Sequence, residues 1–585
     1  MRGVSNDAAG GAVMWALFIR LMIVALVATM LSARFVYAQV PGPLEPTRPS
    51  EDLAPPLEPR AMPTPSVPLT REQLAPDRAD SMKLTLKAVR IEGAEALSES
   101  DLADLWEGYL GQTVSVATLF EIVNAITRRY SEAGYALSIA VLPEQRIEDG
   151  VVTIRVVEGY VDTVVFTGDL LTSVLGDGRG DAARNELLER FAAGITASRP
   201  LRTDDLERYL LLMNDLPGVT ARATFAASRD VPGASTMTVD IARKTVEGQV
   251  GFNNHMVSNL GRTRIGGAVA LNGQLTGGDQ LRLEAWRGTH SDTYAYIAGS
   301  YSQMVGGDGL KLGATAAYSN SEPRDGLLAD LEYIGRSVSL GFSADYPLIR
   351  TRQENLYIGA SFDVLNAQSE LLDIPFSEDR IRTLGVYTTY DVADETGAVS
   401  LVRLGLIQGI DVFGATDDDD PLKSRANGSA TFTNLELRAL RDQPLVGPWS
   451  LYVQAQAQVA LGDPLLSAAE CSFGGRNIGR GYDVGAMSGD HCLMGGVDLR
   501  WTQRLDENLG VQLYGFTDFG LARQKGTLQS GEDRTRDAMS WGGGVRVQVG
   551  QRVTGNIEIA KPLDAEFAED NSRSPRVFVS ITTRF

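Results

Sequence analysis

Cysteine and histidine are scarce in this chain. Its 585 residues include two cysteines, Cys471 and Cys492, and three histidines, His255, His290 and His491. A zinc site or a cysteine–histidine catalytic pair needs such residues in a spaced cluster, and nothing near the adjacent His491 and Cys492 completes one. The chain also lacks a phosphate-binding glycine loop followed by Lys and Ser or Thr. These absences argue against an enzyme, a metal site or a bound cofactor.

Basic residues are also too few to balance the acidic ones. The chain has 54 Lys and Arg against 74 Asp and Glu, which gives a formal net charge of -20 at pH 7. No basic stripe offsets this charge locally. Nucleic acids and anionic membrane surfaces both attract positive charge, so we expect neither as a partner.

Long apolar runs are missing after the N-terminus, which excludes membrane-spanning helices there because such a helix needs about 20 apolar residues. Near the N-terminus, Arg20 separates an apolar run at 12–19 from a second at 21–31. Each run alone is too short to span a bilayer, which disfavours the alternative of an uncleaved membrane helix. Small residues up to Ala38 complete the pattern of a cleavable secretory signal, which we assign to residues 1–38.

Proline is concentrated in residues 39–82, directly after the expected signal. Proline fixes φ and removes a backbone donor, so neither helix nor sheet extends through such a stretch. We therefore expect an extended linker between the signal and the first folded domain.

Two segments after the linker, residues 83–159 and 160–244, share one order of elements: strand, two helices, two strands. In the first segment the expected strands are 84–93, 136–143 and 150–159, and the expected helices are 98–107 and 114–133. In the second segment they are strands 161–169, 220–228 and 235–243, and helices 184–193 and 203–214. This internal repeat predicts two small α/β domains in tandem.

Helical periodicity ends after Lys244, and short alternating runs separated by Gly, Asp, Asn and Pro take its place. In residues 451–459 the odd positions are apolar and the even positions are Tyr or Gln, so one face suits lipid and the other water. We expect sixteen strands, beginning near residues 248, 264, 280, 293, 310, 333, 355, 380, 398, 430, 449, 492, 509, 536, 552 and 575. An even number of strands lets an antiparallel sheet close without an edge in lipid.

A soluble β-sandwich would also alternate, but the last ten residues favour a membrane. Val577, Val579, Ile581, Thr583 and Phe585 share one face of the final strand. This ending resembles the C-terminal signal by which bacterial outer-membrane barrels are recognised for assembly, with Phe585 as its aromatic end. We therefore predict an antiparallel transmembrane β-barrel of sixteen strands over residues 245–585.

The two α/β domains carry motifs that resemble a known family. The first has Tyr130, Gly134, Tyr135, Leu137, Leu142, Pro143, Gln145, Asp149, Gly150, Glu158 and Gly159. The second has RPLRTDDLERYLLLMNDLPGV (199–219) and PGAS (232–235). They resemble the first and second POTRA domains of two-partner secretion transporters in the Omp85 superfamily. The resemblance implies an outer-membrane protein of a Gram-negative bacterium with periplasmic POTRA domains, a secreted exoprotein as its partner, contact with outer-membrane lipid, and insertion by the barrel-assembly machinery.

Residues 471–492 lie between the eleventh and twelfth expected strands. Their Arg480, Gly481 and Tyr482 resemble the Arg-Gly-(Phe or Tyr) tip of the loop that enters the pore in this family, and Gly474 and Gly475 also fit the family's pattern. Phe516, Asp518 and Gly520 resemble the family motif on strand thirteen, whose acid pairs with the loop arginine. The resemblance therefore implies an ion pair between Arg480 and Asp518 inside the barrel. The residues alone leave open that Arg480 lies on an exposed loop and that Asp518 is one lumen carboxylate among many.

Export through an oxidising compartment favours a disulfide between Cys471 and Cys492. This bond would close the loop and stabilise the folded chain by ~3 kcal/mol, because it restricts the unfolded chain.

Two departures from the family pattern stand out. The proline-rich linker replaces the helix that often plugs the pore in relatives, which argues against gating by such a plug. Gly479 precedes the tip where an apolar residue is common, which suggests a looser tip.

Other classes of protein remain as alternatives. An Omp85-type assembly factor would insert other barrels into the membrane, but it normally carries more than two POTRA domains. A passive porin would need no POTRA domain, and a barrel enzyme would need a catalytic constellation that the sequence does not offer. The expected function is therefore export of a partner exoprotein, of the kind that serves haemolysins and filamentous adhesins.

Overall fold

The computed structural model describes residues 58–62, 73–169, 179–290, 293–526, 528, 533–568 and 571–585. The expected signal, residues 1–38, and most of the expected linker, residues 39–82, lie outside these ranges. Within them, no helix has both the length and the apolar character needed to cross a bilayer.

The first α/β domain is a small sheet covered by one long helix. Strands β2 (Ala88–Glu92), β5 (Val151–Val157) and β4 (Ile139–Val141) form the sheet in the order β2-β5-β4, with β2 parallel to β5. Helix α3 (Val116–Glu132) buries Leu119, Ile122 and Ile126 against it. The Tyr130 hydroxyl donates to Glu158 at 2.9 Å. Burial and this carboxylate raise the pKa of Tyr130.

Two elements of this domain differ from the expectation. The strand expected over 84–93 is two strands, because β1 (Lys83–Thr85) pairs with β3 (Thr113–Ser115) while β2 joins the main sheet. Leu86 between them is fully buried. The helix expected over 98–107 is one turn, α2 (Glu99–Leu102), followed by two 3-10 turns (Ala103–Leu105 and Glu107–Tyr109).

The second α/β domain repeats the plan of the first. Its sheet has the order β6-β8-β7, with β6 (Tyr160–Gly168) parallel to β8 (Ala234–Arg243) and β7 (Val219–Ala227) antiparallel to β8. Helices α4 (Arg179–Ala197) and α5 (Thr203–Asn214) stand between β6 and β7 in the chain. Their buried side chains, among them Phe191 and Leu212, pack with Met237 and Val239 of the sheet.

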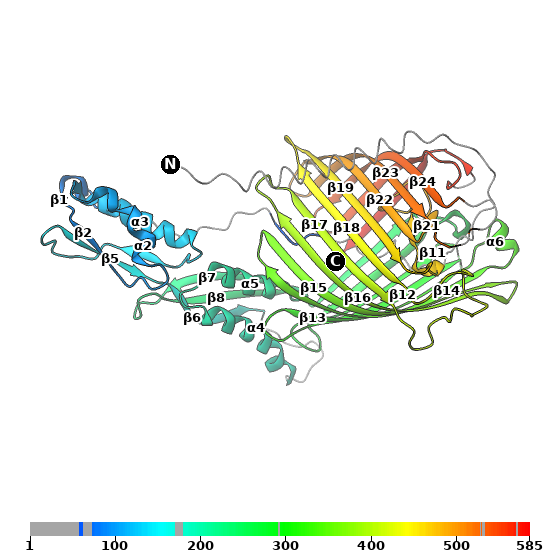
Figure 1. Cartoon of the computed structure of the whole chain (residues 1–585), viewed down its shortest axis with the longest axis horizontal. Coiled ribbons are helices and arrows are strands. Elements are labelled where there is room, and N and C mark those ends of the chain that lie inside the picture. Colours follow the sequence, from blue (N-terminus) through cyan, green and yellow to red (C-terminus); the bar gives the residue numbers. More distant parts are fainter. Residues whose placement is uncertain are drawn as a thin grey trace. The chain divides into compact units, whose positions relative to one another are not determined.

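The rest of the chain is a closed barrel of sixteen antiparallel strands, which confirms the predicted fold class. The strands follow one another around the barrel in chain order (Figure 1). The last strand, β26, pairs with the first, β9, and closes the barrel. They are β9 (Val246–Asn253), β10 (Arg264–Asn272), β11 (Asp279–Gly288), β12 (Tyr294–Val305), β13 (Leu310–Ser321), β14 (Ile334–Arg350), β15 (Glu354–Leu371), β16 (Ile374–Ala393), β17 (Val399–Gly409), β18 (Thr433–Pro444), β19 (Trp449–Leu461), β22 (His491–Arg504), β23 (Leu509–Arg523), β24 (Thr535–Val549), β25 (Val553–Pro562) and β26 (Arg576–Arg584).

Side chains alternate between the outer wall and the lumen, as a period of two requires. On β25, Ile557 and Ile559 are 56% and 53% exposed on the outside, whereas Glu558 between them is 3% exposed. Fifteen strands begin within three residues of their predicted starts, but β16 begins at Ile374 rather than near Arg380. The hairpin of β15 and β16 runs on past the apolar stretch into polar residues such as Ser377, where hydrophobic alternation gives no signal.

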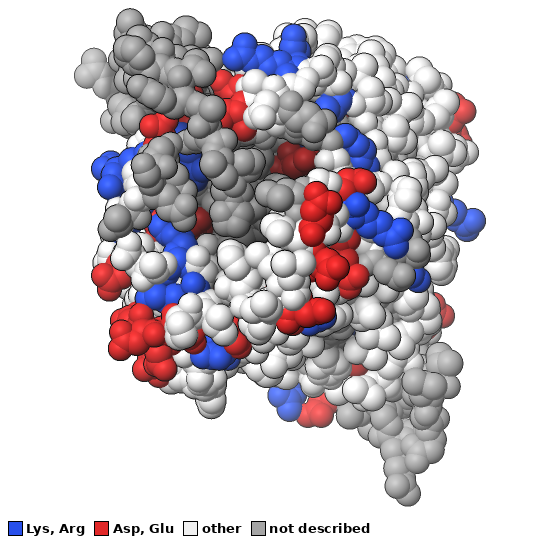
Figure 2. Space-filling model, turned by 90° about the vertical axis from the view of Figure 1, so that its right-hand side faces the viewer, with Lys and Arg blue, Asp and Glu red and all other residues white. Residues whose placement is uncertain are grey.

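The two ends of the barrel differ in their connections. Short hairpins join strands at one end, and there helix α5 of the second α/β domain contacts β14: Asp215 accepts two hydrogen bonds from Arg350, both 2.8 Å long. Longer loops join the strands at the other end, where the short helix α6 (Leu327–Asp330) lies between β13 and β14. Acidic and basic side chains are interspersed on this long-loop end (Figure 2).

Candidate functional site

The connection between β19 and β22 folds into the barrel instead of projecting away from it. Within it, the short strands β20 (Cys471–Phe473) and β21 (Met487–Gly489) pair with each other as a hairpin. A disulfide joins Cys471 to Cys492 on β22, so the whole hairpin is closed at its base. We call residues 471–492 the pore loop. Because Cys492 is in this disulfide, it offers no thiolate for a metal or catalytic role beside His491.

Apolar side chains of the pore loop form a small core with the barrel wall. Phe473, Tyr482 and Met487 are each at most 2% exposed, and they pack with Met494, Ala522 and Ala538 of the neighbouring strands. A loop that buries such residues is held against the wall by the hydrophobic effect as well as by polar contacts. The loop is therefore a packed part of the interior.

The tip of the loop is centred on Arg480, which lies against Asp518 of β23. The Asp518 carboxylate accepts hydrogen bonds from the side-chain Nε and Nη2 of Arg480 at 3.0 and 2.7 Å. It also accepts from the backbone N–H groups of Gly479 and Arg480 at 3.1 and 2.9 Å. Arg480 is 4% exposed and Asp518 is not exposed at all. The structure thus brings together the two residues that the family resemblance pairs.

Asp498 of β22 is a second acid at the tip, which the sequence reasoning did not single out. Arg480 Nη2 donates to Asp498 Oδ1 at 2.6 Å, and Arg500 Nη2 donates to Asp498 Oδ2 at 3.0 Å. Arg500 also pairs with Asp442 of β18 at 3.5 Å. Each buried charge at the tip therefore has a partner of opposite sign, in a place where an unpaired charge would be costly. The available signal was strand parity, which puts Asp498 on the lumen face of β22 opposite Phe516.

Phe516 and Gly520 are the other two members of the motif on β23. Both contact the pore loop. The Arg480 guanidinium lies over the Phe516 ring, with its central carbon 3.6 Å from the ring centroid. Gly520 lies under the Phe473 ring, and a Cβ on Gly520 would overlap that ring. The motif therefore supplies one carboxylate, one aromatic face and one gap for a neighbouring ring.

Gly479 does not loosen the tip, contrary to the expectation from its departure from the family pattern. Its φ of 80° is left-handed, a conformation that glycine adopts without strain. This conformation lets two successive N–H groups converge on one carboxylate oxygen of Asp518. A Cβ at this position would also press on Gly474 and the Phe473 ring. Glycine at 479 therefore tightens the contact.

The remaining residues of the tip also contact the wall. The Tyr482 hydroxyl donates to the Met539 carbonyl at 2.6 Å and accepts from the Asp564 N–H at 3.0 Å. Gly481 packs directly on the backbone at Lys561 and Pro562. Gly475 donates its N–H to the Tyr482 carbonyl at 3.1 Å, and Gly474 is its neighbour in a left-handed conformation with φ of 120°. The glycines that the sequence pointed out thus form the turn that carries the tip.

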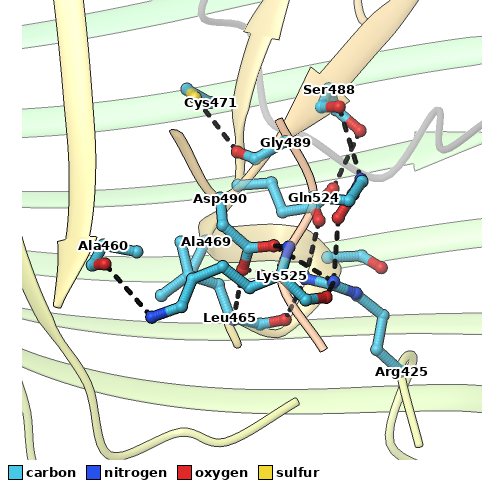
Figure 3. Close-up of polar contacts among 12 residues, drawn as sticks. Arg425, Ala460, Leu465, Ala469, Cys471, Ser488, Gly489, Asp490, Gln524 and Lys525 are labelled. Atoms are coloured by element: carbon cyan, nitrogen blue, oxygen red, sulfur yellow. Dashed lines mark hydrogen bonds and ion pairs between the residues drawn. The ribbon is translucent and has the colours of Figure 1, made fainter. Parts of the chain in front are cut away.

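A second polar network anchors the root of the loop at the long-loop end of the barrel (Figure 3). Asp490 is fully buried, and its carboxylate accepts from both terminal nitrogens of Arg425 at 3.0 and 3.2 Å. It also accepts from the backbone N–H groups of Leu465 and Lys525, each at 2.6 Å. Arg425 comes from the β17–β18 loop and Lys525 from the β23–β24 loop. Asp490 therefore joins three loops beside the disulfide.

Removal of the tip carboxylate should release Arg480. In Asp518→Ala, Arg480 loses three hydrogen bonds to the wall and Gly479 loses one, a loss of ~3 to 5 kcal/mol for a buried pair. We expect trypsin to cut after Arg480 at least tenfold faster relative to cutting after Arg476, which is exposed in the same loop. The fragments separate only after reduction, because the cut lies inside the disulfide-closed loop. Asp363→Ala, which removes an exposed acid on the lumen face of β15, is the control. An unchanged cleavage ratio in Asp518→Ala would show that Asp518 does not hold the tip.

Removal of the root carboxylate should weaken the long-loop end as a whole. Asp490→Ala removes one of the two carboxylates that bind Arg425, the other being Glu470 at 2.7 Å. It also leaves two backbone N–H groups without their acceptor, at ~1 to 3 kcal/mol for each buried donor left unsatisfied. We expect the folded barrel to convert to its unfolded form at a lower temperature on heated gels. Asp418→Ala removes an exposed acid from the same β17–β18 loop and should leave that temperature unchanged. Equal temperatures for both variants would show that the Asp490 network adds no stability.

Comparison with known proteins agrees with this architecture. A family model described as "Haemolysin secretion/activation protein ShlB/FhaC/HecB" matches residues 234–547, and one described as "POTRA domain, ShlB-type" matches residues 84–159. The "Heme/hemopexin transporter protein HuxB" of Haemophilus influenzae (strain 86-028NP) is 23% identical over 493 residues, which cover 83% of this chain and 84% of HuxB. The "Outer membrane transporter CdiB" of Dickeya dadantii is 22% identical over 498 residues, or 82% of this chain and 83% of that protein.

The fold is also that of solved relatives. The structure of CdiB from Escherichia coli superposes with a TM-score of 0.69 at 19% identity, over 89% of this chain and 94% of the other. CdiB from Acinetobacter baumannii gives a TM-score of 0.59 at 15% identity over the full length of both chains. The haemolysin secretion/activation family model and the transporters HuxB and CdiB favour a secretion transporter over the alternative of an assembly factor. Since the first family model covers more than half of the sequence, the chain belongs to the haemolysin secretion/activation (ShlB/FhaC/HecB) family of the Omp85 superfamily, and it is an outer-membrane transporter of two-partner secretion with periplasmic POTRA domains and a secreted protein as its partner.

Proposed function

We propose that the partner exoprotein crosses the barrel as an extended chain and that the contact of Arg480 with Asp518 holds the pore loop in the resting state. The observation that carries this proposal is the contrast between the two ends of the loop. Its root is bound covalently through Cys471 and Cys492, whereas its tip is held by non-covalent contacts alone. Contacts of the latter kind can break and form again at each passage of the partner.

No nucleotide is available outside the inner membrane to drive this transport. Folding of the partner outside the cell, together with a blocked return, supplies the direction of movement in this proposal. A chain that buries its apolar surface only after export cannot re-enter the barrel in its folded form.

We further propose that the partner is first bound by β7 of the second POTRA domain, which is an edge strand of its sheet. Asn214 covers this edge at Ala221, where it donates to the carbonyl and accepts from the N–H. By parity, the N–H groups of Ala223 and Phe225 point to the same open edge. An extended segment of the partner can add to the sheet there as a further strand.

Membrane insertion is proposed to use the C-terminal strand. The backbone of Phe585 exchanges two hydrogen bonds, each of 3.0 Å, with Gly248 at the seam between β26 and β9. Its ring is 68% exposed on the outer wall, beside outward residues such as Val577 and Ile581. A free aromatic end of this kind is what the barrel-assembly machinery would bind before the seam closes, and outer-membrane lipid would cover this wall afterwards.

Secretion of the partner tests the role of the tip. Cells that express the partner with Arg480→Ala or Asp518→Ala should secrete at least tenfold less of it, because the loop no longer has its resting position. Surface assembly of each barrel is measured in parallel, and Asp363→Ala is again the control. Undiminished secretion by both variants would show that transport does not need the contact of Arg480 with Asp518. No secretion even with the native chain would reject this partner.

The edge strand is tested by proline. Ala223→Pro removes an outward N–H without removing a hydrogen bond inside the sheet, and edge strands tolerate proline. We expect the purified periplasmic domains with this change to bind the secretion domain of the partner at least tenfold more weakly. Ala223→Thr keeps the N–H and should bind normally. Equal binding by all three proteins would show that the partner does not use this edge.

A further inference from the structure

A short piece of the N-terminal linker is bound to the barrel. Residues 58–62, which we call the strap, lie at the short-hairpin end. The backbone N–H groups of Arg60 and Ala61 both donate to Asp391 Oδ2 on β16, at 3.1 and 2.6 Å. The Met62 N–H donates to the Arg352 carbonyl in the β14–β15 hairpin at 2.7 Å. Three successive N–H groups of the strap are thus bound by the barrel.

The side chain of Arg60 adds contacts of its own. Its Nη1 donates to the Tyr357 hydroxyl at 2.8 Å, and its guanidinium carbon lies 4.7 Å from the centroid of that ring. Asp215 of the second POTRA domain is 3.9 Å away. The arginine side chain is 48% exposed, so solvent screens its charge, and the backbone contacts give the strap most of its hold. Ala61 is 6% exposed, so the barrel also buries its methyl group.

The residues that receive the strap are held in place by one another. Asn355 is fully buried, donates to the same oxygen of Asp391 at 3.0 Å, and accepts from Arg350 at 2.9 Å. Arg350 in turn binds Asp215. Asp391 is 2% exposed. A carboxylate positioned in this way is a preformed acceptor, so binding a peptide there requires little reorganisation of the barrel.

The site lies where an exported chain must enter. Tyr357 and Asp391 are on the lumen face of their strands, because their neighbours Ile358 and Tyr390 are 44% and 36% exposed on the outer wall. The POTRA domains are periplasmic and one of them contacts the same hairpins, so this end of the barrel is its periplasmic mouth. A peptide bound at Asp391 therefore lies at the entrance of the lumen.

We propose that Asp391, Asn355 and Tyr357 form a peptide-binding site and that the strap is its internal ligand. An extended segment of the secreted partner, with an arginine before a small residue, displaces the strap. The chemistry of the site selects this occupant: one buried carboxylate binds two successive N–H groups, a tyrosine binds the guanidinium, and the small side chain after the arginine is buried. The second half of the proposal rests on the proposed route of the partner through the barrel.

A direct binding measurement tests the site without the partner. The probe is a fluorescent peptide with the sequence of residues 56–64, added to the full chain in detergent. The strap competes at the high effective concentration of a tethered ligand, on the order of millimolar. The peptide should therefore bind at least tenfold more tightly when residues 58–62 are replaced by glycine and serine. Asp391→Ala in that background should abolish binding, and Tyr357→Phe, a milder change, should weaken it.

Control measurements separate the possible outcomes. A peptide with glutamate at the position of Arg60 should not bind, and Arg146→Ala, at an exposed POTRA residue, should change nothing. Equal affinity for the native and strap-replaced chains, or binding that survives Asp391→Ala, would overturn the site. Secretion of the partner is then compared for the native chain and Asp391→Ala: a reduction supports use of the site by the partner, and equal secretion overturns that use while leaving the transporter function intact.

Discussion

Pairing of the charges buried in the lumen determines where the pore loop lies. Asp518 has no exposure to solvent and holds four donors, all of them from Gly479 and Arg480. The arginine that satisfies Asp518 also needs Asp498, and Asp498 needs Arg500. Removing one of these side chains leaves its partners with an unpaired charge that solvent does not reach. The turn around Gly479, the aromatic seat on Phe516 and the packing of Tyr482 all follow from keeping this group of charges together.

Sequence reasoning reached the barrel because its signal is local and repeated. Alternation of apolar and polar residues marks each strand, and parity along β23 placed Phe516, Asp518 and Gly520 on one face. It failed where the chain carries no such signal. The first six residues of β16, Ile374 to Asp379, do not alternate between apolar and polar side chains, and Leu86 divides one expected strand between two sheets. In both places the pairing partner, which is distant in the chain, decides the structure.

Contacts between distant segments explain what sequence reasoning missed at the site. Asp490 looks like any loop acid until the loops that carry Arg425 and Lys525 are brought beside it. Asp391 is likewise an ordinary strand residue until residues 58–62 reach it. The expectation of an extended linker agrees with the strap, which has no helix or strand among its described residues, but nothing in its composition indicates where it binds. Burial of an acid with backbone donors around it is visible only in three dimensions.

The disulfide at the root of the pore loop limits how far the tip can move from the barrel wall. Arg480 follows Cys471 by nine positions, and nine extended residues reach about 30 Å at most. A tip that leaves its seat therefore remains within reach of Asp518 throughout. Its return is a first-order event that does not depend on the amount of protein in the membrane. Because the backbone ties the tip to the barrel in any case, resetting after each passage is a property of a single molecule. The disulfide shortens the tether, and the search of this shorter chain sets the rate of return.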